Sequence, residues 1–121
     1  MYWDECCEIE DLKYKVLKKI MLSKDNDELI FITKDNERYT FYHEQDCCEY
    51  VTVDDVCGDF NDLLDVPLLE VEEVTNTDFE ECDESCTWTF YKFGTIKGSV
   101  TVRWYGTSNG YYSESVSLRK E

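Results

Sequence analysis

The sequence predicts an α+β fold, a strongly twisted and mainly antiparallel sheet of six or seven strands with one or two short helices. Runs of β-branched and aromatic residues recur along the chain between turn residues, a pattern typical of strands. Two short segments instead place apolar residues at helical spacing. At 121 residues and 14.4 kDa the chain has the length of one domain, so we expect a single domain over residues 1–121.

The N-terminal third is expected to form a short helix followed by a meander of three strands. Residues 8–20 are expected to open with a short helix and to pass into a strand. The apolar residues that indicate the helix are Ile9, Leu12, Val16 and Ile20. The runs 29–33 and 38–43 are rich in β-branched and aromatic residues, which favours strands. The polar tetrapeptides before them, at 24–27 and 34–37, predict turns.

The middle third predicts a second short helix between two strands. Val51-Thr52-Val53 is read as a short strand, after which Asp54 or Asp55 can cap a helix over 55–64. Pro67 ends this helix. The residues after it predict a strand and then an exposed acidic loop, at 68–74 and 75–86.

The C-terminal third predicts three further strands, at Thr87–Phe93, Ser99–Tyr105 and Tyr111–Leu118. The glycine-containing loops 94–98 and 106–110 connect them and are good hairpin signals. Strand alternation divides the middle run into an apolar face and a mixed face. The first holds Val100, Val102 and Trp104, and the second holds Thr101, Arg103 and Tyr105.

Acidic residues dominate the charge of the chain, which is formally −16. Residues 44–84 contain 16 acids and no Lys or Arg, whereas residues 92–121 contain five bases and two acids. This charge argues against non-specific binding of DNA, RNA or anionic lipid by the whole surface. The chain has no apolar run near 18 residues and starts with acids, so we expect neither a membrane span nor a signal peptide.

The sequence gives weak signals for catalysis and for metal binding. His43 is a possible base with Cys47 or Cys48 as nucleophile, but nothing in the sequence places an acid to orient the imidazole. Six soft ligands suffice in number for zinc, but their spacing fits no CxxC knuckle pair or finger: His43, Cys47, Cys48, Cys57, Cys82 and Cys86. We therefore expect that the protein is not an enzyme and that it binds neither a cofactor nor a metal. An odd total of seven cysteines without an export signal predicts reduced, mostly buried thiols.

Aromatic residues are unusually dense near the C-terminus, and a single core does not account for all of them. Eight lie within 25 residues: Trp88, Phe90, Tyr91, Phe93, Trp104, Tyr105, Tyr111 and Tyr112. One short helix cannot cover both faces of a sheet, so the surplus face predicts a partner subunit or a ligand. Arg103 beside Tyr105, near Lys92 and Lys97, can combine an anion clamp with a stacking platform. The alternative is a solvated arginine on a strand.

Several short elements, in order, resemble a family of small phage and prophage proteins. They are His43 to Glu49, Asp54-Asp55, Gly58-Asp59, Leu68 to Glu72, and Asn109 to Tyr112. The pattern is similar to diverged relatives of the first-described Thoeris anti-defence proteins. That resemblance implies a non-enzymatic, oligomeric sponge that sequesters a cyclic ADP-ribose or cyclic oligonucleotide immune signal of the Thoeris or CBASS defence systems. It also implies that the chain acts in the cytoplasm of a bacterial host.

The expected ligand is a small anionic nucleotide derivative, held where the loop 106–110 meets Cys47-Cys48-Glu49. The candidate binding residues are Cys47, Cys48, Glu49, Lys92, Arg103, Tyr105, Ser108, Asn109, Gly110, Tyr111 and Tyr112. The alternative is a purely structural role, in which Asn109-Gly110 forms a hairpin turn and binds nothing. A rival function of another class is an acidic mimic of nucleic acid, in which segment 44–84 blocks a host defence protein. Neither interpretation includes direct nucleic-acid binding.

Overall fold

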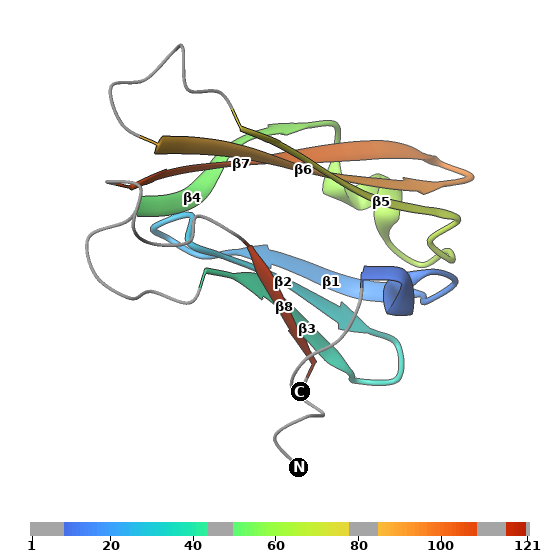
Figure 1. Cartoon of the computed structure of the whole chain (residues 1–121). Helices are drawn as coiled ribbons and strands as arrows, with labels where there is room; N and C mark the ends of the chain where they lie inside the picture. Colours follow the sequence, from blue (N-terminus) through green and yellow to red (C-terminus); the bar gives the residue numbers. More distant parts are fainter. Residues whose placement is uncertain (1–8, 44–49, 78–84, 109–115, 121) are drawn as a thin grey trace.

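The fold is a β-sandwich of two four-stranded antiparallel sheets, which lie one above the other in Figure 1. The computed structural model describes residues 9–43, 50–77, 85–108 and 116–120. Its first sheet has the order β1-β2-β3-β8, and its second sheet has the order β4-β7-β6-β5. The strands are β1 Leu17–Leu22, β2 Glu28–Thr33, β3 Arg38–Tyr42, β4 Tyr50–Cys57, β5 Glu70–Thr77, β6 Ser85–Thr95, β7 Gly98–Ser108 and β8 Ser117–Lys120.

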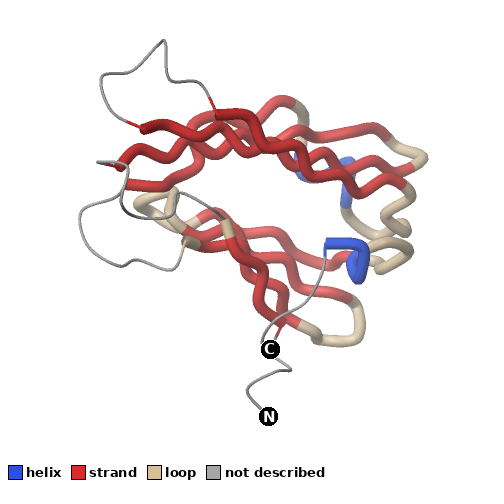
Figure 2. Tube along the Cα trace, in the orientation of Figure 1, coloured by secondary structure: helices blue, strands red, loops and turns tan. Residues whose placement is uncertain are grey.

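The α+β prediction is therefore wrong, because the described residues contain two 3-10 helices and no α-helix (Figure 2). These are η2, Ile9–Leu12, and η3, Phe60–Leu63. The helix expected over 55–64 shrinks to η3, because β4 continues through Cys57 in register with β7. Asp59 caps η3, its Oδ1 accepting a hydrogen bond of 2.9 Å from the backbone N–H of Asn61.

The single sheet of six or seven strands is also corrected to two sheets, since β4 belongs to the second sheet and β8 belongs again to the first. The meander β1-β2-β3 is confirmed, and Asn26 and Asn36 take left-handed backbone conformations in its two turns. In the second sheet β5, β6 and β7 are consecutive neighbours and β4 lies beside β7, which is a Greek-key order.

Several expected boundaries move once the strands pair. The loop expected over 75–86 is partly strand, because β5 reaches Thr77 and β6 begins at Ser85. The glycine-rich loops expected at 94–98 and 106–110 start later, since β6 extends to Thr95 and β7 to Ser108. The last described strand is β8 rather than 111–118, and residues 109–115 lie outside the described part of the chain.

One hydrophobic core fills the space between the sheets. The face of β7 predicted to be apolar is confirmed, with Val100, Val102 and Trp104 each at most 1% exposed. β6 places Tyr91 and Phe93 on the same face, as register partners of Val102 and Val100. From the first sheet, Leu17, Leu29, Phe31 and Phe41 are fully buried and pack in the same core. The pairs among Phe31, Phe41 and Phe93 meet edge-on, with ring centroids 5.0–5.9 Å apart.

Gly58 marks the sharp exit from β4 and has a left-handed φ of +114°. A Cβ at this position would lie 2.6 Å from the carbonyl oxygen of Ser99. We expect Gly58→Ala to lower the free energy of unfolding by at least about 1–2 kcal/mol, the cost of a left-handed residue, with the backbone clash added. Urea denaturation measures this. The control Gly94→Ala should cost less, because its nearest neighbour is a Glu70 side-chain carbon at 3.2 Å.

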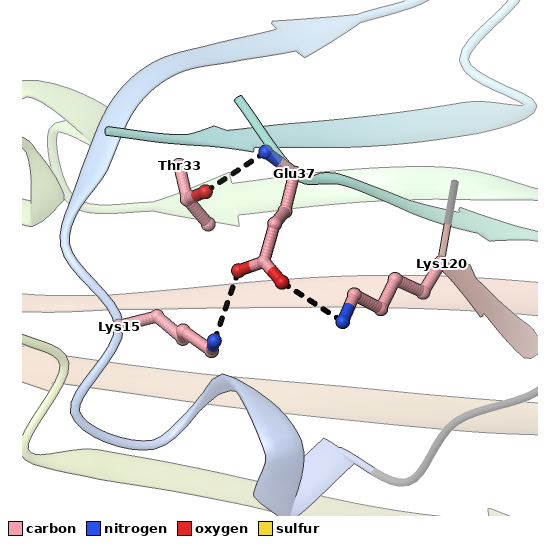
Figure 3. A network of polar contacts seen from close by, with 4 residues as sticks. All are labelled: Lys15, Thr33, Glu37 and Lys120. Carbon is pink, nitrogen blue, oxygen red and sulfur yellow. Dashed lines mark hydrogen bonds and ion pairs between the residues drawn. The ribbon is translucent and has the colours of Figure 1, made fainter. Parts of the chain in front are cut away.

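Glu37 ties the β2–β3 turn to two distant elements (Figure 3). Its carboxylate accepts hydrogen bonds from Lys15 Nζ at 2.9 Å and from Lys120 Nζ at 2.8 Å. Its backbone N–H donates to Thr33 Oγ1 at 3.1 Å. The bonds from Lys120 and then Lys15 lower the pKa of the Glu37 carboxyl, and the bond to Glu37 raises the pKa of Lys15.

The Glu37 ion pairs should make a pH-dependent contribution to stability. A lowered carboxyl pKa stabilises the folded state above the unfolded pKa, and this is lost as the pH falls through the folded pKa. Glu37→Gln should therefore destabilise the protein near neutral pH, and the difference from the wild type should shrink below the ordinary pKa of 4.5. Urea denaturation of both proteins from about pH 7 to pH 3 tests this. A constant difference would contradict it.

Candidate functional site

The outer face of the second sheet carries an arginine among aromatic rings. Strand alternation turns Trp88 and Phe90 of β6 away from the core, opposite Tyr105 and Arg103 of β7 respectively. Each of these four side chains is half-buried. We call Trp88, Phe90, Arg103 and Tyr105 the aromatic face. Lys92 of β6 is exposed on the same side, one alternation further along the strand.

The rings and the guanidinium of the aromatic face contact one another. The ring centroids of Trp88 and Tyr105 are 4.2 Å apart, and the planes are tilted by 43°. The Arg103 guanidinium carbon lies 5.0 Å from the Trp88 ring centroid, within the range of a cation–π interaction. Part of each ring stays open to solvent, so a flat group can stack on this surface.

A β-bulge in β4 brings a carboxylate to Arg103. Val53 pairs with Trp104 and Asp55 pairs with Arg103, so Asp54 is an extra residue in the strand. Arg103 Nε donates to Asp54 Oδ2 at 3.0 Å, and Nη2 donates to the same oxygen. Both side chains are 39% exposed. Because the two bonds converge on one oxygen, the Nη1 donors of Arg103 are not used by Asp54.

The structure brings together some of the candidate binding residues, and others lie outside its description. Arg103, Tyr105 and Lys92 share the outer face of the second sheet, as predicted for Arg103 and Tyr105. Ser108 ends β7, and nothing is described of its side chain. Seven candidates lie outside the described residues: Cys47, Cys48, Glu49, Asn109, Gly110, Tyr111 and Tyr112. Tyr50, the first residue of β4, is the register partner of Thr107, the last residue but one of β7.

Sequence reasoning missed Asp54 as the partner of Arg103 and left open which aromatics face outward. Alternation on β6 separates Trp88, Phe90 and Lys92 from Thr89, Tyr91 and Phe93. The same alternation in the next run turns Thr101, Arg103 and Tyr105 outward. Pairing the two runs as a hairpin would have identified the outward aromatic residues from the sequence. The Asp54 contact depends on a bulge, for which the sequence carries no comparable signal.

The cysteines only partly follow the prediction. Cys57 is free and exposed, and its Sγ donates to Asp55 Oδ2 at 3.6 Å. Cys86 is 1% exposed and disulfide-bonded, so the prediction of reduced thiols is wrong for Cys86. Among the described residues, no three His, Cys, Asp or Glu side chains gather as metal ligands. Cys47, Cys48 and Cys82 of the zinc candidate lie outside that part.

The two described cysteines should differ sharply in reactivity. In native, non-reduced protein, iodoacetamide is expected to modify Cys57 and to leave Cys86 unmodified. Reduction and unfolding should then expose Cys86 to the reagent. Peptide mapping by mass spectrometry before and after reduction measures both. Modification of Cys86 without reduction would contradict this expectation.

Comparisons with known proteins place the chain in a family without assigning it an activity. No helix in the described ranges has the length and apolar character that crossing a membrane requires. No curated protein and no solved structure matches the chain. A family model described as "Domain of unknown function (DUF7448)" matches residues 10–118, nearly the whole chain. The chain therefore belongs to the DUF7448 family.

Proposed function

We propose that the protein binds and sequesters an anionic nucleotide-derived ligand, a cyclic nucleotide or a cyclic ADP-ribose, without turning it over. The aromatic face is the observation that supports this proposal. It combines a guanidinium, the commonest two-pronged phosphate donor, with two rings that can stack on a base.

The two halves of such a ligand match the two kinds of group on this face. A base stacks on the open parts of Trp88 and Tyr105, an interaction worth roughly 1–3 kcal/mol per base. A phosphate takes the free donors of Arg103 and the ammonium of Lys92. Holding a ligand needs no general base or nucleophile, so sequestration demands only this binding chemistry.

The overall charge of −16 opposes an anionic ligand only at long range. At physiological ionic strength the Debye length is about 8 Å, so distant carboxylates are largely screened. The carboxylate that matters is Asp54, which already contacts Arg103. The ligand phosphate must therefore compete with Asp54 for the guanidinium. An exposed ion pair is worth about 0.2–1 kcal/mol, so this competition costs the ligand little.

The biological role that we propose is that of a phage-encoded counter-defence sponge. The resemblance of the chain to Thoeris anti-defence proteins supports this role. Such a protein acts as a homo-oligomer, and we place the subunit contact at the two edge strands of the second sheet, where Tyr50 of β4 and Val74 of β5 are 62% and 48% exposed, which leaves the aromatic face on β6 and β7 to the ligand. Light scattering at micromolar concentration tests this, and a particle of about 14 kDa would contradict it.

The proposed compartment is the cytoplasm of a bacterial host. The disulfide of Cys86 opposes this placement, because cytosolic thiols are normally kept reduced. Acid quenching of expressing cells followed by thiol alkylation tests the point. Cys86 reduced in the cell supports the cytoplasm, and Cys86 oxidised in the cell contradicts it.

Native mass spectrometry of the purified protein, followed by analysis of the denatured extract, tests sequestration. The expected result is a nucleotide-sized mass increment that is released unchanged on denaturation. Calorimetry against cyclic ADP-ribose isomers and cyclic di- and trinucleotides then identifies the ligand. No retained molecule and no heat with any member of this panel would refute the proposal.

A second candidate is the acidic mimic of nucleic acid, favoured by one specific feature of the second sheet. Residues 50–77 carry eight acids and no base, and seven of the eight are exposed on β4, β5 and the segment between them. A mimic would bind a basic protein tightly and with a steep salt dependence, and would hold no small molecule. The mass spectrometry experiment therefore separates the two candidates.

A further inference from the structure

A cleft of about 510 Å³ lies between the segment before β1 and the turn after β2. Its lining residues are Lys13, Tyr14, Lys15, Val16, Thr33, Lys34 and Asp35. None of them belongs to the second sheet, so the cleft is separate from the aromatic face. Small-molecule sites in proteins commonly have volumes of roughly 300–1,000 Å³.

The cleft gathers cations in a protein that is otherwise strongly acidic. Three lysines and one aspartate line it, whereas the whole chain has a charge of −16. Lys34 Nζ lies 2.7 Å from Asp65 Oδ1 in an exposed ion pair, which a competing anion can replace at small cost. Lys15, the third lysine of the lining, shares the carboxylate of Glu37 with Lys120 of β8 (Figure 3).

Lys13 is the cation best placed to receive a ligand. Its Nζ lies 5.4 Å from the centroid of the Tyr14 ring. A carboxylate would compete with a ligand for this ammonium, but the described residues show no ion pair for it. Lys13 and the exposed Lys34 each carry an ammonium group with several N–H donors, one of which Lys34 gives to Asp65, and this suits a group with several anionic oxygens.

Tyr14 presents an aromatic ring beside these ammonium groups. It is 67% exposed and has a φ of 72°, which is unusual for a bulky residue. Hydrogen bonds fix the backbone on both sides: Tyr14 N–H donates to Leu68 O at 2.7 Å, and Leu68 N–H donates to Lys15 O at 3.0 Å. An exposed ring contributes little to the core, and glycine or asparagine would adopt this φ more easily. These bonds fix the backbone from which the exposed ring extends beside the cleft.

We propose that this cleft binds a phosphate-bearing small molecule of mononucleotide size, with the phosphates between Lys13 and Lys34 and a flat ring on Tyr14. The inference does not depend on the proposed function, because it uses different residues. It assigns the cleft two requirements, a multiply charged phosphate group and a stacking ring, which can be tested separately.

Calorimetry of the full chain at low ionic strength tests the proposal with three probes: ADP, pyrophosphate and adenosine. ADP is expected to bind most tightly, pyrophosphate more weakly and adenosine very weakly. Lys13→Gln should weaken ADP binding at least about tenfold. Tyr14→Asn retains a residue that tolerates the left-handed backbone and removes the ring, so it should weaken ADP binding and leave pyrophosphate binding unchanged.

Two control variants keep the result interpretable. Lys24→Gln removes the same charge from the exposed β1–β2 turn and should leave ADP binding unchanged. Trp88→Ala removes a ring of the aromatic face and so separates the two sites, because ADP binding that survives in this variant belongs to the cleft. Absence of ADP binding, or equal losses in Lys13→Gln and Lys24→Gln, would overturn the proposal. Loss of ADP binding in Trp88→Ala would place the nucleotide at the aromatic face and would equally overturn it. Circular dichroism melting confirms that each variant is folded.

Discussion

Replacing Trp104 with alanine is expected to lower the free energy of unfolding by about 3–5 kcal/mol. Trp104 is fully buried and belongs to the shared core of both sheets. Alanine would leave a cavity where β7 packs against the first sheet. The total free energy of unfolding of a native domain is only about 5–15 kcal/mol, so this substitution removes a large part of it. Urea denaturation followed by circular dichroism measures the change.

Trp104→Phe is the matched control for this prediction. The indole Nε1 of Trp104 is buried and finds no hydrogen-bond acceptor among the described residues. A buried donor without a partner costs about 1–3 kcal/mol, and phenylalanine removes that cost along with part of the ring volume. Trp104→Phe should therefore cost less than half as much as alanine. Equal costs would show that the packed ring is not what stabilises the core.

The two members of the Arg103–Asp54 ion pair should change ligand capture in opposite directions. Arg103→Ala removes the phosphate donor and is expected to weaken capture at least tenfold, about 1.4 kcal/mol. Asp54→Asn removes the competing carboxylate and should strengthen capture by up to about fivefold, since an exposed pair is worth up to about 1 kcal/mol. Calorimetry with the ligand identified from the panel measures both.

Lys97→Ala serves as the charge-matched control, because Lys97 is exposed in the β6–β7 turn, outside the aromatic face. It should leave capture nearly unchanged. A merely structural ion pair would predict the same direction of change for Arg103→Ala and Asp54→Asn. Weakening by both variants would therefore contradict the proposed role of Arg103, whereas a melting temperature that stays nearly constant in both would support it.

The sequence alone determined the elements that depend on local pattern. The turns at 24–27 and 34–37, and the meander that they connect, follow from polar tetrapeptides between β-branched runs. The division of β7 into a buried and an outward face follows from its strict alternation. This alternation also placed Arg103 and Tyr105 together, so part of the candidate site was predictable.

Only the tertiary structure decided the number of layers, the end of β4 and the partner of Arg103. Val51, Val53 and Val56 are spaced by two and then by three residues, which in sequence favours a strand that gives way to a helix. Pairing with β7 keeps all three on the core side by accommodating Asp54 as a bulge. That bulge turns a carboxylate toward Arg103, a contact between residues 49 positions apart. The lysine cleft likewise joins residues 13–16 to 33–35. Such contacts arise from strand pairing and burial between distant segments, and local propensity does not encode them.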